Sequence, residues 1–195
     1  MKKIFFVAFF VVFFDQCLKF WIKTSFVLGE ELRIFDWFIL HFTENNGMAF
    51  GMEFGGYAGK KILTILRIVI VALGIYYVSK MNISKLSFGA LASVGLILGG
   101  AIGNIIDSCF YGLIFSDSYL KVASLFPSGG GYAELFHGKV VDMFYLPIIK
   151  TQVWDWVPFL GGKGFVFFQP VFNVADSAIS IGVVLLILFF KKQFD

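Results

Sequence analysis

Hydrophobic positions in this chain gather in four long runs, at residues 4–24, 62–78, 88–107 and 172–190. A helix needs about 20 mostly apolar residues to cross the hydrocarbon core of a bilayer, so each run predicts a membrane-spanning helix. The second run is slightly short, and we expect Lys60 and Lys61 to extend from its end toward the membrane interface. Two long segments, 25–61 and 108–171, connect the runs on the opposite side from the termini.

Lysines at the ends of the runs predict the orientation of the chain. Six of them fall on one side of the predicted membrane, namely Lys2, Lys3, Lys80, Lys85, Lys191 and Lys192. Short flanks that carry lysine stay in the cytoplasm, so both termini are expected there and the two long segments outside. Residues 4–14 resemble the core of a secretory signal peptide, but no small-residue cleavage site follows, and we expect a retained first span.

Each run carries a polar residue at a similar depth. At about 1.5 Å per residue, Asp176 and Arg67 lie roughly 20 Å from the cytoplasmic lysines of their runs, and Asn104 lies roughly 24 Å from the start of its own. Asp15 and Asp107 fall in the same layer, the outer third of a core about 30 Å thick. Independent helix-pairing hydrogen bonds would not need a common depth. Because intramembrane acids are expensive, this coincidence predicts one functional site.

Three pairs of polar residues in the runs share a helix face because they are three or four positions apart. These pairs are Asp15 with Lys19, Asn104 with Asp107, and Asn173 with Asp176. The first pair can form an ion pair. In the other two, the amide can donate to the neighbouring carboxylate and fix its orientation.

The two outer segments contain turn signals and aromatic residues. Asn46-Gly47 is a hairpin-turn signal between short apolar runs, so we expect a small sheet over the polar layer. Trp154 and Trp156 fit the aromatic belt of a membrane interface. The expected fold is therefore an all-α polytopic membrane protein of four transmembrane helices, with a small extramembrane β-sheet cradle on its outer face. We expect residues 1–195 to form one membrane-embedded domain.

Composition agrees with a membrane protein and narrows the possible partners. The chain is 58% hydrophobic and only 15% charged, whereas soluble domains carry about a quarter charged residues. The net charge of +3 comes without a long basic run, so nucleic acid is not an expected partner. Cys17 and Cys109 are expected to be buried free thiols, and His41 and His137 are isolated loop or cradle residues. These residues lack metal-ligand spacing, and no cofactor is expected.

The chemistry is predicted from Asp142, within Lys139-Val140-Val141-Asp142-Met143, together with Asp176. Two nearby carboxyls cannot both ionise easily, so one keeps its proton. The carboxylate can then take a proton from water while the acid polarises a carbonyl and protonates the leaving amine. No serine, cysteine or histidine arrangement competes as a nucleophile and base. The residues favour an aspartyl hydrolase at the membrane surface, and which aspartate holds the proton stays open because a coupled pair titrates as a unit.

Five motif blocks, in order along all four runs, resemble those of lipoprotein signal peptidase, also called signal peptidase II. The blocks are Asp15-Gln16 with Lys19; Asn45-x-Gly47-x-Ala49-Phe50; Gly99-Gly100-Ala101-Ile102-Gly103-Asn104-Ile105-Ile106-Asp107; Val140-Val141-Asp142; and Phe172-Asn173-x-Ala175-Asp176. The resemblance implies a monomeric, multi-pass enzyme of the bacterial inner membrane, in contact with membrane lipid. It would cut prolipoproteins just before a cysteine that carries diacylglyceryl.

The same resemblance assigns roles to individual residues. The catalytic aspartates of the family fall on Asp142 and Asp176. Supporting or substrate-binding positions fall on Asp15, Lys19, Asn45, Gly47, Asn104, Asp107, Asn173 and Ala175.

The chain departs from the family pattern in two ways. The family usually has arginine after the aspartate of the third block, where this chain has Ser108. We propose that Arg67 supplies the missing guanidinium; the alternative is that Arg67 extends toward the interface. The chain also has an insert at 113–137 and a long stretch at 147–164. These segments could widen the cradle, control lateral access, or have no effect.

Three rival functions fit the sequence less well. A transporter would be expected to show an internal repeat and broken helices, which this chain lacks. A haem protein would need axial histidines on facing spans, whereas His41 and His137 lie outside the runs. A structural membrane protein would not need acids at one depth.

Overall fold

The computed structural model describes residues 1–47, 55–152, 154, 156, 161–162, 164–167 and 169–194. Its helices are α1 (Lys2–Lys23), α2 (Gly56–Lys80), α3 (Phe88–Ile106), α4 (Gly112–Ile114) and α5 (Val174–Leu185). Its strands are β1 (Glu31–Phe35), β2 (Phe38–Asn45), β3 (Val140–Tyr145), β4 (Ile149–Gln152) and β5 (Gly164–Phe167). Within the described residues, four helices are long and apolar enough to cross a membrane.

Several helices are longer than their hydrophobic runs predicted. The π-helical turn Asp107–Tyr111 joins α3 to α4, so the third span stays helical to residue 114. The fourth continues from α5 through Leu186–Phe190 and Lys191–Gln193. A 3-10 turn, Ile83–Lys85, links α2 to α3. Because α2 begins at Gly56, the outer segment predicted to reach residue 61 is shorter than expected.

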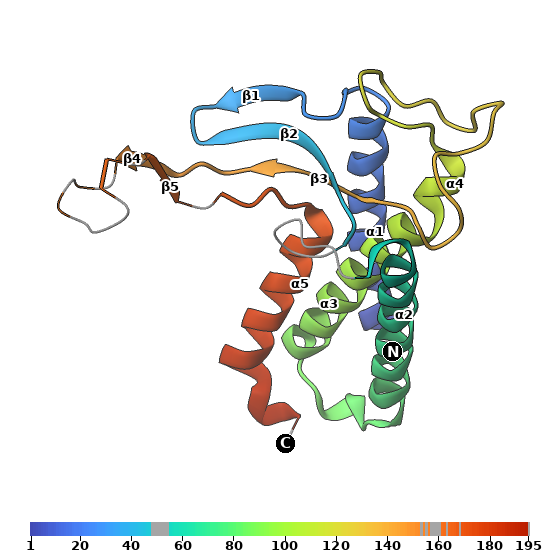
Figure 1. The fold of residues 1–195 in the computed structure, drawn as a ribbon. Coiled ribbons are helices and arrows are strands. Elements are labelled where there is room, and N and C mark those ends of the chain that lie inside the picture. Colours follow the sequence, from blue (N-terminus) through green and yellow to red (C-terminus); the bar gives the residue numbers. More distant parts are fainter. Residues whose placement is uncertain are drawn as a thin grey trace.

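Figure 1 shows α1, α2, α3 and α5 side by side, with β1, β2 and β3 across one end of the bundle. Both chain termini lie toward the opposite end, and β4 and β5 extend sideways beyond the main sheet. The predicted fold class, a mostly helical membrane protein with a small sheet at one end, is confirmed.

Small residues allow the helices to approach closely. A Cβ added at Gly99 would lie 2.8 Å from the backbone oxygen of Ala8 on α1, and one at Gly100 would lie 2.3 Å from that of Ala175 on α5. Lipid tails are as apolar as leucine, so membrane helices associate through close packing and hydrogen bonds instead of hydrophobic burial. The glycines of α3 therefore place this helix between α1 and α5.

The main sheet is antiparallel in the order β1-β2-β3. Its register pairs Thr43 with Asp142 and Asn45 with Val140, so the end of β2 lies beside the start of β3. The turn between β1 and β2 pairs Phe35 with Phe38, the first residue of β2. The hairpin expected at Asn46-Gly47 stays a prediction, because residues 48–54 lie outside the described residues. Within the described residues, the strands that pair with β2 are β1 on one side and β3 on the other.

A hydrophobic cluster joins the sheet to the end of α1. Its fully buried members include Ile22, Phe42, Tyr111, Phe115 and Val141. These residues come from α1, β2, the π turn, the insert and β3, so five separate chain segments share one core. The insert 113–137 therefore contributes to this core.

Two predictions about individual side chains are corrected by the structure. Lys60 is buried, and its ammonium donates to the backbone oxygen of Asn46 at 2.9 Å instead of extending to the interface. Cys17 and Cys109 are both free thiols, but Cys17 is exposed on the surface of α1. The lipid tails around a membrane helix are apolar, so a thiol can remain on the helix surface without contacting water.

We predict that Gly99→Ala lowers the thermal stability of the protein in detergent, because the new methyl group forces α1 and α3 apart. Gly74→Ala is the matched control, since a Cβ at Gly74 meets nothing within 4 Å. Alanine also favours the helix over glycine by up to about 1 kcal/mol. Equal unfolding temperatures for the two variants would contradict the close-packing role of Gly99.

Candidate active site

A buried lysine joins α1 to α3 at the sheet end of the bundle. The side chain of Lys19 has no exposed surface, and its ammonium lies 2.9 Å from the Asp15 carboxylate and 2.7 Å from the Asp107 carboxylate. The ammonium also donates to the side-chain oxygen of Asn104 at 2.9 Å. Lysine has three donors, so all of them are paired. The predicted ion pair between Asp15 and Lys19 is therefore present.

The two carboxylates extend this centre to β3 and α5. Asp107 accepts the backbone N–H of Val141 at 3.2 Å and the side-chain amide of Gln16 at 2.9 Å. Asp15 accepts the backbone N–H of Ala175 at 2.9 Å. The backbone N–H of the residue just before each candidate aspartate is thus hydrogen-bonded to a carboxylate that shares the buried lysine.

Two asparagines connect the lysine centre to Asp142 and Asp176. The oxygen of Asn104 accepts from Lys19, and its amide nitrogen donates to the Asp176 carboxylate at 2.8 Å. The oxygen of Asn173 caps α5 by accepting the N–H of Asp176 at 2.8 Å. Its amide nitrogen donates to the Asp142 carboxylate at 2.7 Å. One side chain, Asn173, therefore contacts both aspartates.

These bonds differ from the pairing that the spacing along each helix predicted. Asn104 donates to Asp176 on another helix, whereas Asp107 was its predicted partner. Asn173 donates to the carboxylate on β3 and contacts only the backbone N–H of Asp176. Each amide therefore serves a carboxylate from a different element.

Asp142 lies on β3 with 5% of its surface exposed. Its carboxylate accepts from Asn173 and, through its other oxygen, from the side-chain amide of Asn45 at the end of β2. Burial, reinforced by the nearby charge of Asp176, raises the pKa of Asp142 to about 7, against the opposing effect of the two amide donors and Lys19. A carboxyl with this pKa can give or take a proton at neutral pH, as general acid and base catalysis requires.

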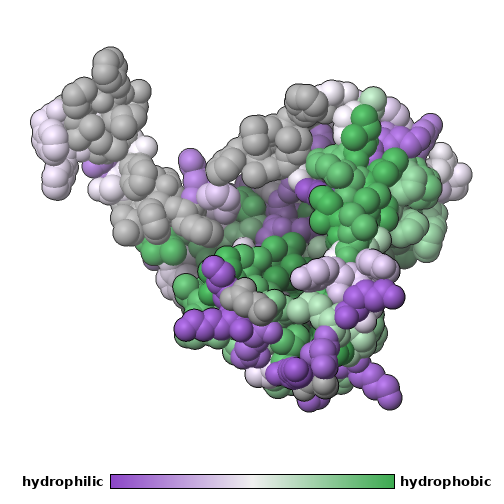
Figure 2. Space-filling view, turned by 90° about the horizontal axis from the view of Figure 1, so that it is seen from below, coloured by the Kyte–Doolittle hydropathy of each residue, from purple (hydrophilic) through white to green (hydrophobic). Residues whose placement is uncertain are grey.

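The two aspartates line one cavity of about 800 Å³, a volume typical of ligand-binding pockets. Its polar lining comprises Asn45, Gly47, Arg67, Asn104, Asp142 and Asp176, among other residues. Figure 2 shows polar side chains recessed between apolar surfaces when the molecule is seen from the end of the helix bundle. Among the described residues, no group of three or more His, Cys, Asp or Glu side chains could hold a metal ion.

Arg67 reaches the cavity from α2. Its guanidinium donates to the backbone oxygen of Gly47, which has a φ of +90°. A Cβ at Gly47 would also lie 2.6 Å from the Arg67 guanidinium. Glycine is thus favoured there by its backbone conformation, and a side chain would also have to displace the end of Arg67. Arg67 binds a carbonyl in the cavity wall, while Asp107 is held by Lys19 and Gln16.

A family model for signal peptidase II matches residues 7–192. The chain belongs to the signal peptidase II family. A lipoprotein signal peptidase from Porphyromonas gingivalis is 50% identical over 179 residues, covering 91% of this chain and 78% of the relative. Another from Amoebophilus asiaticus is 38% identical over 188 residues, covering 93% of this chain and 75% of the relative.

Solved structures give the same fold. A bacterial membrane enzyme determined by the in meso method at 2.3 Å resolution matches with a TM-score of 0.61 and 24% identity, covering 100% of this chain and 91% of that one. The curated bacterial relatives, together with the four apolar helices among the described residues, support a bacterial membrane protein. Membership of the signal peptidase II family makes the chain a protease.

All the site residues proposed from the sequence lie in this hydrogen-bonded network or line the cavity. Two motif residues, Ala49 and Phe50, fall outside the described residues. Ser108, where the signal peptidase II pattern usually has arginine, is fully buried, and within the described residues its hydroxyl has no hydrogen-bond partner.

Sequence reasoning did not assign a role to Gln16 or to Lys23. Gln16 donates to both buried carboxylates, to Asp107 at 2.9 Å and to Asp15 at 3.1 Å. Lys23 forms a second buried ion pair with Glu44. A signal for Lys23 was available, because it follows Lys19 by four positions and so lies on the same face of α1.

We predict that Lys19→Met strongly destabilises the protein, because Asp15 and Asp107 lose their shared counter-charge while remaining buried. Removing one partner of a buried ion pair typically costs about 3–5 kcal/mol. Lys61→Met is the control, since Lys61 is exposed on α2. Thermal unfolding in detergent measures both, and an unfolding temperature for Lys19→Met equal to that of the control would rule out the central role of this charge.

Proposed function

We propose that this chain is an intramembrane aspartic endopeptidase that removes the signal peptide from diacylglyceryl-modified prolipoproteins, cutting just before the lipidated cysteine. Membership of the signal peptidase II family supports removal of signal peptides from prolipoproteins. The observation that carries the aspartic mechanism is that Asp142 and Asp176 line one cavity and are both contacted by Asn173.

The environments of the two aspartates support different roles. With its pKa raised to about 7, Asp142 keeps its proton in about half of the molecules at pH 7, far more than an ordinary carboxyl does. Asp176 lies in the first turn of α5, where the helix dipole favours a negative charge, and accepts a hydrogen bond from Asn104. We therefore assign Asp142 as the starting acid and Asp176 as the starting base.

Hydrolysis follows from these protonation states. The Asp176 carboxylate takes a proton from water, and the water oxygen attacks the carbonyl carbon of the scissile peptide bond. The protonated Asp142 donates a hydrogen bond to the carbonyl oxygen, where negative charge develops. When the carbon–nitrogen bond breaks, a carboxyl proton passes to the leaving amine, so the pair returns to one proton.

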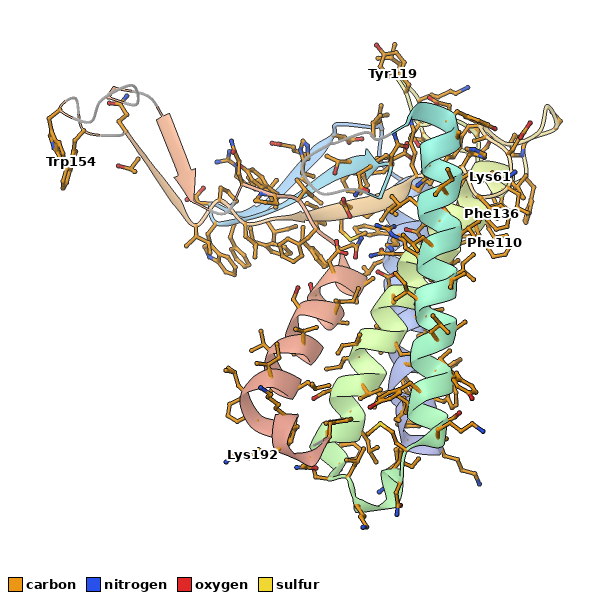
Figure 3. The ribbon with its side chains drawn as sticks, turned by 60° about the horizontal axis from the view of Figure 1, so that its bottom comes forward. Lys61, Phe110, Tyr119, Phe136, Trp154 and Lys192 are labelled. Carbon is orange, nitrogen blue, oxygen red and sulfur yellow. The ribbon has the colours of Figure 1, made fainter. Side chains whose placement is uncertain are left out.

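Substrate access is proposed to come from the membrane. A signal peptide helix carries its cleavage site near the outer surface, at the depth of the cavity. The lysine-rich ends of the helices lie away from the cavity, and Lys192 marks that end in Figure 3. The positive-inside rule then supports cytoplasmic termini in the bacterial inner membrane and a site facing outward. We call Asp142 and Asp176 together the dyad. We infer that Arg67 supplies positive charge beside the dyad and fixes Gly47 in the cavity wall.

The proposed dyad predicts that Asp142→Asn and Asp176→Asn each reduce cleavage at least about a thousandfold, because residues that act as a unit fail together. Purified protein is mixed with a diacylglyceryl-modified prolipoprotein, and the shorter product is followed by gel mobility. Asp36→Asn is the control, because the Asp36 side chain is 96% exposed on the sheet hairpin. Near-normal cleavage by either dyad variant would exclude the assignment.

Activity is predicted to fall as the pH rises through about 7, since Asp142 then loses the proton that it must donate. Its folded-state pKa lies above the ordinary value of 3.8, so the folded state binds more protons between these values. Folding stability should consequently fall from about pH 4 to about pH 7. Asp142→Asn cannot ionise and should flatten this part of the curve of unfolding temperature against pH. A wild-type rate that is constant or rising from pH 6 to 9 would refute the role of Asp142 as the acid.

A further inference from the structure

A second buried charge lies close to the dyad. Lys23 has no exposed surface, and its ammonium contacts the Glu44 carboxylate, whose side chain is only 3% exposed. The ammonium also donates to the hydroxyl of Ser118 at 2.9 Å. Three elements therefore meet at this ion pair: α1, β2 and the insert 113–137.

Aromatic rings complete the surroundings of this ammonium. It lies 5.4 Å from the ring centre of Phe115, 5.0 Å from that of Tyr132 and 5.8 Å from that of Phe42. The first two rings belong to the insert, as does Ser118. The insert thus supplies most of the lining around a charge that α1 carries.

The insert is hydrogen-bonded to the polar groups of β2 and to the main chain just before β3, the two strands that position Asp142. Glu44 immediately precedes Asn45, whose amide donates to the Asp142 carboxylate. On the other strand, the hydroxyl of Tyr132 accepts the backbone N–H of Lys139 at 2.7 Å, directly before β3 begins. A polar side chain of the insert therefore holds each strand: Tyr132 binds the main chain three residues before Asp142, and Ser118 contacts the Lys23–Glu44 pair one residue before Asn45.

The anchoring of the insert argues against a freely moving lid. Its Phe115, Ser118 and Ala123 are buried, and its backbone accepts from α2, where Thr64 donates to Phe136 at 3.1 Å. An element that is packed and hydrogen-bonded at several points can fix the geometry of its neighbours, whereas a lid must separate from them.

We propose that the insert 113–137 positions the catalytic strands, with Ser118 and Tyr132 as positioning residues that keep Asn45 in contact with Asp142. Ser118 acts through the Lys23–Glu44 ion pair on β2, and Tyr132 acts through the backbone before β3. Neither side chain is required to touch the substrate. This inference rests on the proposed function of Asp142 and Asp176.

The test removes single hydroxyl groups from the full-length protein. Ser118→Ala and Tyr132→Phe leave the Lys23–Glu44 pair and the aromatic rings in place, so both variants are expected to fold. We expect kcat for the lipidated prolipoprotein to fall about tenfold with KM unchanged, because small displacements of reacting groups reduce the rate steeply. Ser118→Thr keeps a hydroxyl at this position and should restore most of kcat.

Matched controls come from the same insert. Tyr119 is 67% exposed and lies at the tip of the insert in Figure 3, and Ser128 is also exposed. Tyr119→Phe and Ser128→Ala should keep the wild-type kcat. Folded Ser118→Ala and Tyr132→Phe proteins with wild-type kcat would overturn the positioning role while leaving the proposed function intact.

Hydrogen–deuterium exchange separates the two proposals. Exchange at residues 41–45 and 139–142 should speed up in Tyr132→Phe relative to Tyr119→Phe, whether or not cleavage is observed. If the wild-type protein fails to cleave the lipidated prolipoprotein, the proposed function is wrong. If exchange in these strands is the same in both tyrosine variants, the positioning role is wrong.

Discussion

One buried ammonium group constrains the assembly of this molecule. Lys19 is enclosed by two carboxylates and an amide oxygen, and it has no exposed surface. Removing charges from water costs several kcal/mol each in real proteins, and this is offset only where geometry and hydrogen bonding are good. Helices α1 and α3 must therefore meet at one depth and one rotation. Gly103 permits this approach, because a Cβ there would lie 2.6 Å from the Asp15 carboxylate.

The position of Lys19 fixes the two aspartates of the dyad through Asn104 and Asp107, each of which contacts Lys19 and also a group at or next to one of them. Asn104 accepts from Lys19 and donates to Asp176, while Asp107 binds Lys19 and the backbone of β3 next to Asp142. Fully paired polar networks are rigid and specify one arrangement. Catalytic groups work best when their supports are fixed before the substrate arrives. The chain can therefore lack an arginine at Ser108 and still hold the carboxylate beside it.

The sequence predicted those parts of the site that depend on local spacing. Span positions follow from run length, and the ion pair of Asp15 with Lys19 follows from a separation of four residues on one helix. The partners of Asn104 and Asn173 were predicted wrongly, because spacing along one helix does not specify which neighbouring helix or strand its face meets. Lys60 was also misjudged, since the carbonyl of Asn46 that binds it lies outside the helix, 14 residues earlier in the chain, where helical spacing makes no prediction.

By itself, the sequence determined that the chain crosses a membrane through four apolar helices, that polar residues share one depth, and which family motifs it carries. These are properties of residue type and order. Only the tertiary structure decided that Asn173 contacts both aspartates, that Lys19 neutralises Asp15 and Asp107 together, and that the insert surrounds Lys23. The reason is physical: a buried charge must find its partners wherever folding brings them, and those partners come from elements far apart in the chain.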